Sequence, residues 1–406
     1  MNLHAYSHFG GQHWETANLK NVLAFSGLRA PQDQDVLDEA LLLGIGGGIQ
    51  PGYSFHPGVL DKTGGLFISG RSRMMLSVPE FAEKVLNRLG ASPNLYATSG
   101  AQGAFHKVIS DLQQGLPSIV YLHKTSLPYL HLPAIRGEQV FMHTVVVIAH
   151  DEQRDSVIVG DQAPGPLVLT VDDFIAARSR IPLYKNQSMT VQVPGKLTEA
   201  SLRSAVKAGI EDYLELSEHP RTRLLSLDGL EAWARIVGSP RHPQAWQKIY
   251  RKGTLYRPLL DTYESIEVFG GGGGLFRPMY AAFLEQAARI LDQPGLAEVA
   301  EMYRALGSEW TDLAEACLPR EVAILAEARL HVRERHRLFL EEGESGGAEM
   351  ARHTGRLQEI DQQLAGDDFP LAGDQADDFF LGLSNRIAGI VLQERKVLEI
   401  LAQVMR

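Results

Sequence analysis

A β-branched run in the first half of the chain constrains the fold more than any other feature. Residues 143–149, His-Thr-Val-Val-Val-Ile-Ala, are apolar almost throughout, which is typical of a strand that is buried on both faces. The polar residues 151–155 then form a turn, and residues 156–161 return as a second strand. We therefore expect a central β-hairpin around which the first half of the chain folds.

The hydrophobic periodicity changes near residues 186–198. Short helices and strands alternate before this point, and the pattern after it is helical almost throughout. A Pro-Gly pair at residues 194–195 marks the boundary. We predict an α+β domain at residues 1–194 and an all-α domain at residues 195–406. Helices of the second domain are expected at residues 199–216, 226–237, 243–250, 255–267, 275–292, 295–317, 320–341, 348–365 and 375–405.

Shorter patterns predict the remaining elements of the first domain. Thr170 is the expected N-cap of a helix at residues 171–178, because Asp173 stands three positions after it. The other expected elements are helices at residues 34–44, 79–89 and 105–114 and strands at residues 66–69 and 118–123.

Composition and charge limit the classes of function. The formal net charge of −10 argues against a general nucleic-acid binder. No apolar run reaches about 18 residues, so no membrane span is expected, and the first residues lack the basic and apolar regions of a signal peptide. Cys317 is the only cysteine, which excludes an internal disulfide and fits a reducing cytoplasm. Its helical surroundings predict a packed core thiol.

The segment at residues 7–27 predicts an exposed helix start. Gly10 and Gly11 lead into a helix that begins near Trp14 or Glu15 and stops at Gly27. Free backbone N–H groups at a helix start stabilise negative charge, so such positions often carry a nucleophile. The cysteine expected for that role is absent. Glu15 in the first turn is a helix cap in one interpretation and an acid in the other.

The hairpin brings a histidine and an aspartate near each other. With the turn centred between Glu152 and Gln153, Thr144 lies opposite Asp161 and His143 is diagonal to it. A slip of one residue, or the extra twist at a strand end, could bring the His143 and Asp161 side chains within hydrogen-bond reach. A carboxylate that holds an imidazole in one tautomer makes a general base. The alternative is a structural histidine and a turn aspartate.

The motifs along the chain, in order, resemble a known family. They are Gly11-x-His13-x-Glu15-Thr16-x-x-Leu19-x-Asn21-x-Leu23, Leu43-Gly44-x-Gly46-x-Gly48, Gly70-Arg71-Ser72, Leu112-x-x-Gly115-x-Pro117 and His143-x-Val145-Val146-Val147 with Asp161. This pattern resembles the N-terminal domain of butirosin biosynthesis protein H. The block at residues 266–277, with Tyr280, Phe283 and Leu284, resembles the uncharacterised helical domain that often follows it.

The resemblance implies a papain-like fold and an acyl transfer in antibiotic biosynthesis. An aminoacyl group would pass from the phosphopantetheine thioester of an acyl carrier protein to a small-molecule amine, forming an amide. The phosphopantetheine belongs to the donor, so no further cofactor is implied. Family members commonly have a cysteine after the histidine matched by His13, where this chain has Trp14.

A thioester is already activated toward an amine, so the reaction does not strictly need the cysteine. Proximity alone supplies about 7–11 kcal/mol, and a general base adds roughly 10²–10⁴-fold. In this hypothesis His143, oriented by Asp161, is the base. The N–H groups of Trp14 and Glu15, with His8 or His13, hold the oxyanion. The expected catalytic residues are His143, Asp161, His13 and Glu15, and the expected substrate-binding residues are Trp14, His8, Gly46, Gly47, Tyr53, Arg71 and Arg277.

Two other interpretations of the whole chain remain open. One is a non-catalytic papain-like protein that binds a substrate or partner, which Trp14 favours. The other is a thioester hydrolase that uses the same base with a water. An intramolecular cyclase is a variant of the amide-forming transferase itself. The histidines lack the spacing of a metal site, so no metal is expected.

Two glycine-rich segments and one basic segment have alternative explanations. Gly44–Gly48 predicts either a turn or a close approach of the backbone to a ligand. Gly270–Gly274 precedes a helix with Arg277 in its first turn. This arrangement is typical of an anion-binding site, and the alternative is a flexible hinge between two helices. The basic segment at residues 219–257 is either a docking surface for an acidic carrier protein or a solvated face. The apolar residues of the last predicted helix, at residues 375–405, form either a homodimer interface or part of the core. The basic residues of the basic segment are Arg221, Arg223, Arg235, Arg241, Lys248, Arg251, Lys252 and Arg257, against the acidic Asp228 and Glu231.

Overall fold

The computed structural model describes residues 6–56, 65–72, 78–132, 142–250, 252–366 and 368–406. The chain divides into two compact units. The first unit consists of Met1–Leu42, Ala82–Ala205 and Glu334–Thr354, and the second unit of Leu43–Phe81, Val206–Arg333 and Gly355–Arg406. The predicted domain boundary at residues 194–195 stays a prediction.

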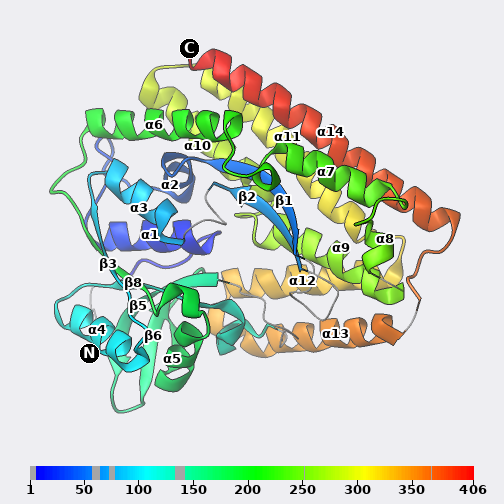
Figure 1. The fold of residues 1–406 in the computed structure, drawn as a ribbon. Coiled ribbons are helices and arrows are strands. Elements are labelled where there is room, and N and C mark those ends of the chain that lie inside the picture. The colour runs from blue at the N-terminus through cyan, green and yellow to red at the C-terminus, as the bar shows by residue number, and fades with distance from the viewer. Residues whose placement is uncertain (1–5, 57–64, 73–77, 133–141, 251, 367) are drawn as a thin grey trace. The chain divides into compact units, whose positions relative to one another are not determined.

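An antiparallel sheet organises the first unit (Figure 1). Within the described residues it has six strands in the order β3-β8-β4-β5-β6-β7. The predicted hairpin is confirmed, because β5 pairs with β6 through the turn that follows Asp151. The strands are β3 (Ser92–Tyr96), β4 (Ser118–His123), β5 (Met142–Asp151), β6 (Ser156–Gly160), β7 (Leu167–Thr170) and β8 (Ser188–Gln192).

Helices pack on both faces of β5. The Asn18 side chain of α1 (Trp14–Phe25) donates to the carbonyl and the hydroxyl of Thr144, at 2.7 and 3.0 Å. Side chains alternate along a strand, so Val145 and Val147 point to the opposite face. There they join a core cluster with Phe105 of α4 (Ala101–Gln113) and Phe174 of α5 (Val171–Ser179). The mixed α and β character predicted from the sequence is therefore confirmed.

The third segment of the first unit contributes to the same core. Leu338, Phe339 and Met350 belong to the core cluster that holds the β5 valines, and each is at most 5 % exposed. Leu338 and Phe339 lie in α12 (Ala323–Glu341), and Met350 lies in α13 (Gly347–Gly366). The core of the first unit is thus built from residues that are more than 200 positions apart in the sequence.

The second unit is mainly helical, as the periodicity predicts. Its long helix α14 packs against α7 and α11 (Figure 1). Trp233, Trp246 and Trp310 are fully buried in this unit. From residue 199 onward its helices, three of which it shares with the first unit, are α6 (Glu199–Glu218), α7 (Leu227–Gly238), α8 (Trp246–Ile249), α9 (Tyr256–Tyr263), α10 (Arg277–Leu291), α11 (Gly295–Cys317), α12, α13 and α14 (Asp374–Val404).

Some elements differ from those expected. The loop predicted around Gly44–Gly48 continues into β1 (Ile49–His56), which pairs with β2 (Gly65–Arg71). The strands β3, β7 and β8 were not expected, and β8 lies in the polar stretch where the hydrophobic periodicity changes. The helix predicted at residues 34–44 is the shorter α2 (Glu39–Ile45), whereas α3 (Val78–Arg88) agrees with its prediction.

Two general expectations concern the whole chain. Cys317 is a buried core residue of α11, as predicted, and burial raises the pKa of its thiol. Among the described residues, no helix combines the length and the apolar character that a bilayer span requires.

Candidate functional site

The predicted histidine–aspartate pair exists. His143 Nε2 lies 2.9 Å from Asp161 Oδ1 and 2.8 Å from Oδ2, and both side chains are fully buried. The predicted register of the hairpin was wrong. A bulge between Val147 and Ala149 shifts the pairing, and Val146 faces Gly160. The next residue, Asp161, is therefore in phase with Val145 rather than with Thr144, on the same face as His143.

Further hydrogen bonds hold the Asp161 carboxylate. The Tyr129 hydroxyl donates to Oδ2 at 3.0 Å, and the backbone N–H of Gln162 donates to Oδ1 at 2.8 Å. Burial, together with the Asp161 carboxylate, raises the pKa of Tyr129 well above its usual value, so this phenol stays a donor. Donors on both oxygens stabilise the ionised carboxylate.

This network assigns the tautomer of His143. Because Asp161 accepts at Nε2, the neutral imidazole carries its hydrogen there and leaves Nδ1 as a lone pair. Among the described residues Nδ1 has no hydrogen-bond partner. A buried, unpartnered imidazole nitrogen beside an orienting carboxylate has the arrangement of a general base.

Trp14, the first residue of α1, covers this imidazole. The ring centroids of Trp14 and His143 are 5.7 Å apart, and those of His13 and Trp14 are 4.9 Å apart. The Thr144 hydroxyl also donates to the Trp14 carbonyl at 3.4 Å. The start of β5 is thus fixed against the start of α1, and Trp14 is only 5 % exposed. The structure brings together His13, Trp14, His143 and Asp161.

A carboxylate that the sequence did not reveal caps the loop before α1. Glu39 Oε1 accepts from the N–H of Gln12 at 2.8 Å, and Oε2 accepts from the N–H of His13 at 3.1 Å and from the Thr16 hydroxyl at 2.7 Å. A side chain at Gly11 would place its Cβ 2.3 Å from the Ala17 Cβ and 2.6 Å from Glu39 Oε1, so the glycine is required. An internal anion therefore already uses part of the helix start.

The two other predicted residues near α1 lie in different surroundings. Glu15 is buried within the first turn. His8 is partly exposed, and burial, with contributions from Arg29 and Lys20, lowers its pKa. Their predicted roles as acid and oxyanion donor stay predictions.

The predicted binding residues Gly46, Gly47, Tyr53 and Arg71 lie in the second unit. A Cβ on Gly46 would overlap the Phe81 ring, and the Arg71 guanidinium lies 4.2 Å above the same ring. The Tyr53 hydroxyl accepts from the indole N–H of a tryptophan at 3.2 Å. Gly47 has a left-handed φ of +103°. Each residue therefore has a packing or turn role, and substrate binding by them stays a prediction.

The predicted anion site at Gly270–Gly274 is occupied by the chain's own carboxylates. Glu267 Oε1 accepts from the N–H of Gly274 at 3.2 Å. Arg277 is fully buried, and its guanidinium lies 2.6 Å from Glu394. Because the positive charge of Arg277 is compensated internally, this geometry favours the structural explanation over an external ligand.

The basic segment is also largely paired. Arg251 lies outside the described residues. Several of the other cations meet acids from distant parts of the second unit, so the segment presents less positive charge than its sequence predicts. The pairs are Arg221–Glu80 at 2.7 Å, Arg257–Asp361 at 3.2 Å and Lys252–Asp368 at 3.8 Å.

Comparison with known proteins agrees with the position of the His143–Asp161 site in the chain. Residues 13–162 match the family described as butirosin biosynthesis protein H, N-terminal. This range starts at His13 and ends just after Asp161, so it contains the whole site. Residues 13–162 belong to this family. The butirosin biosynthesis protein H N-terminal domain is followed, at residues 173–333, by a match to a domain of unknown function, DUF4872. Both matches confirm the resemblance seen in the sequence. No curated protein matches the chain.

One part of the site's surroundings lies beyond both matched ranges. The segment at residues 334–354, which contributes Phe339 to the core of the first unit, follows the DUF4872 match. Neither Glu39 nor Tyr129 carries a sequence signal that singles it out, although both lie within the butirosin biosynthesis protein H N-terminal domain.

Proposed function

We propose that this chain is an acyltransferase that forms an amide or a cyclised product from an acyl carrier protein thioester. The family supports a role in butirosin-like biosynthesis, and thus in natural-product or antibiotic biosynthesis. The observation that carries the proposal is the buried His143–Asp161 pair. Among the described residues His143 Nδ1 has no hydrogen-bond partner, and the imidazole lies beside the ring of Trp14, the first residue of α1.

The proposed reaction is a direct transfer. The amine nitrogen attacks the thioester carbon, and a C–N bond forms while the C–S bond breaks. His143 Nδ1 accepts the proton that the amine loses and passes it to the departing thiolate, which leaves as a thiol. Asp161 stabilises the imidazolium that exists between these two proton transfers.

The residues available support direct transfer. An indole is not a nucleophile for acyl groups, so Trp14 cannot carry an acyl-enzyme intermediate. The thiol of Cys317 is buried in the core of the second unit, and burial keeps it protonated. Activation therefore has to come from the donor, whose phosphopantetheine thioester is reactive toward amines without a covalent enzyme intermediate.

A papain-like arrangement is part of the proposal. It is supported by a helix start early in the chain, a histidine that opens one strand and an acid that follows the next strand, all in one unit. The N–H groups of Trp14 and Glu15 are the proposed oxyanion donors. We propose that the protein works in the cytoplasm with an acidic carrier protein and a small-molecule amine.

A second candidate function has its own supporting observation. Trp14 is buried over the fully buried His143, which also suits a protein that lost its nucleophile and binds a substrate or partner without turnover. A thioester hydrolase would use the same base with water in place of the amine.

The test uses an aminoacyl-loaded carrier protein, a panel of primary amines and mass spectrometry of the products. We expect amide formation by the wild-type chain and a loss of about 10²-fold or more for His143→Gln, as for other general bases. His106→Gln is the matched control, because His106 is exposed on α4. Circular dichroism verifies the fold of each variant.

Three results would argue against the transferase. A folded His143→Gln variant with wild-type turnover would remove the proposed base. Release of free acid in place of amide would indicate the hydrolase. Binding of the loaded carrier protein without any product would indicate the non-catalytic protein.

A further inference from the structure

We infer that Tyr129 is a positioning residue for the His143–Asp161 pair, and that Phe339 holds Tyr129 in place. The inference rests on the proposed role of His143 as base. It adds two residues that the sequence patterns do not reveal, one of which lies outside both matched ranges.

Tyr129 fixes the orientation of the Asp161 carboxylate. Its hydroxyl donates to Oδ2 at 3.0 Å, while the Gln162 N–H donates to Oδ1. Because each carboxylate oxygen has its own donor, rotation of the group would break a charge-assisted hydrogen bond. Asp161 in turn fixes the ring of His143, so the position of its Nδ1 depends on Tyr129.

Phe339 fixes the phenol ring of Tyr129. The two rings are stacked, with centroids 6.2 Å apart and an interplanar angle of 11°, and both are buried. Tyr129 lies in the short helix Pro128–Leu130, so neither a long helix nor a strand of the sheet carries it. Packing from another segment therefore has to supply the rigidity that local backbone structure does not.

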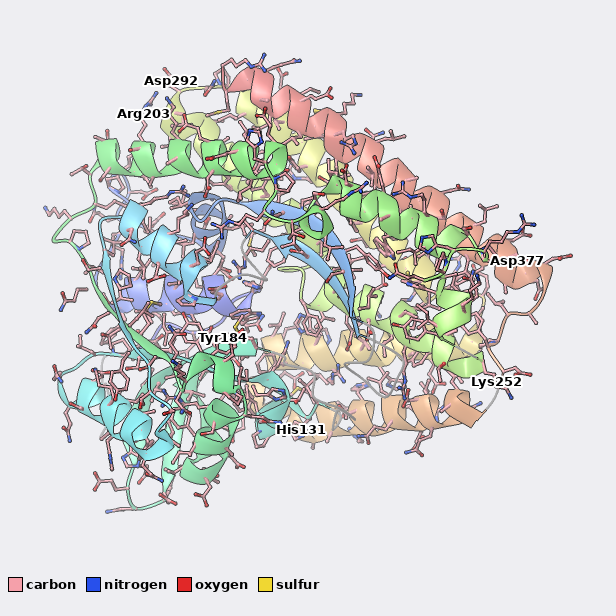
Figure 2. The ribbon with its side chains drawn as sticks, in the orientation of Figure 1. His131, Tyr184, Arg203, Lys252, Asp292 and Asp377 are labelled. Carbon is pink, nitrogen blue, oxygen red and sulfur yellow. The ribbon has the colours of Figure 1, made fainter. Side chains whose placement is uncertain are left out.

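The segment at residues 334–354 holds the chain beside Tyr129 at a second point. The hydroxyl of Thr354 donates to the carbonyl of His131, and Gly347 lies against the His131 ring. A Cβ at Gly347 would come within 3.0 Å of that ring, so the glycine permits a close approach. Figure 2 labels His131, which has a left-handed backbone conformation immediately after the helix of Tyr129.

The test reads the His143 ring directly. Nuclear magnetic resonance of the full chain with ¹⁵N-labelled histidine gives the Nε2–H signal of His143, assigned by its loss in His143→Gln. We expect solvent exchange of this hydrogen to become about tenfold faster in Tyr129→Phe, the effect of losing one hydrogen bond to a charged group. Phe339→Leu should accelerate the same exchange to a smaller extent.

Each variant has a matched control in the first unit. Tyr6→Phe also removes one buried hydroxyl, which has no hydrogen-bond partner among the described residues. Phe174→Leu also truncates a buried core phenylalanine, whose ring packs against the ring of Phe105. Neither control should change the His143 signal, even where it lowers the thermal stability.

Turnover supplies a second measurement. Tyr129→Phe should lower kcat more than it raises KM, and it should move the acidic limb of the pH profile to higher pH. A carboxylate that loses a donor keeps more negative charge toward the imidazolium and stabilises it, so the base form appears at higher pH. A purely structural role would lower the amount of folded protein without moving the profile.

The outcomes separate the two proposals. Unchanged exchange in Tyr129→Phe, or equal acceleration in Tyr6→Phe, would overturn the role of Tyr129. Equal effects of Phe339→Leu and Phe174→Leu would overturn the role of Phe339. The exchange measurement needs no substrate, so its result does not depend on whether His143→Gln abolishes turnover.

Discussion

The Trp14 indole lies against the His143 imidazole, with ring centroids 5.7 Å apart and an interplanar angle of 46°. The unpartnered Nδ1 of His143 and the start of α1 therefore belong to one buried cluster. This relationship makes position 14 the most informative place to change the chemistry of the chain.

Restoring a thiol at this position should create a reactive nucleophile. In Trp14→Cys, a thiol at the helix start and beside an imidazole should be ionised more readily than an ordinary cysteine. We expect iodoacetamide to modify residue 14 at least about tenfold faster than Cys317, which is buried in the second unit. Peptide mapping by mass spectrometry gives both rates. Adding His143→Gln should remove the advantage, and equal rates with and without His143 would contradict the expected geometry.

The Glu39 carboxylate should stabilise the loop before α1. Glu39→Gln keeps the size of the side chain but replaces one acceptor oxygen with a donor that faces backbone N–H groups. We expect a loss of about 1–3 kcal/mol in the free energy of unfolding, measured by urea denaturation. Glu298→Gln is the control, since Glu298 is an exposed acid in the first turn of α11. Equal effects of the two substitutions would show that the capping contacts contribute little.

Two leucines of α12 should respond differently to truncation. Leu338 is 4 % exposed in the core cluster of the first unit, whereas Leu330 is 45 % exposed. Leu338→Ala should lower the free energy of unfolding by about 2–5 kcal/mol. Leu330→Ala should change it by less than about 0.5 kcal/mol. Thermal unfolding followed by circular dichroism compares them, and similar melting temperatures would argue against the core role of this segment.

His336 should make the protein less stable in acid. Burial, with Lys124 and Arg335, lowers its pKa from 6.5 to about 3. The unfolded chain therefore binds a proton between about pH 6.5 and 3 that the folded chain does not. Stability from this group is full above about pH 6.5 and falls as the pH decreases. The loss is at most about 1.4 kcal/mol per pH unit, because only one proton is bound. The urea concentration at the unfolding midpoint should decrease less steeply with falling pH in His336→Gln than in the wild-type chain. His106→Gln should leave this pH dependence unchanged.

Local patterns predicted much of the fold. Period-3.6 apolar spacing marked the long helices, and the end of α1 was marked by Gly27, whose φ is +82°. The strands β3 and β8 were missed because they are short and partly polar, and each finds its partner about 100 residues away. Their pairing depends on tertiary structure that no local period encodes.

The residues of the candidate site were also predicted only in part. His143 and Asp161 could be predicted together because one hairpin carries both. Glu39 is the first residue of the short helix α2, and Tyr129 lies in the short helix Pro128–Leu130. Single residues in such short elements have no periodic signal. Arg277 read as an exposed cation because its partner Glu394 lies 117 positions later in the chain.

The contribution of residues 334–354 to the core of the first unit has a consequence for biosynthesis on the ribosome. The strands that carry His143 and Asp161 leave the exit tunnel long before Leu338, Phe339 and Met350 are translated. Until then the nascent sheet lacks the side chains that close one part of its interior, and such unfinished surfaces bind chaperones or aggregate. The imidazole and its carboxylate partner should thus reach their final geometry only after residues 334–354 have left the ribosome.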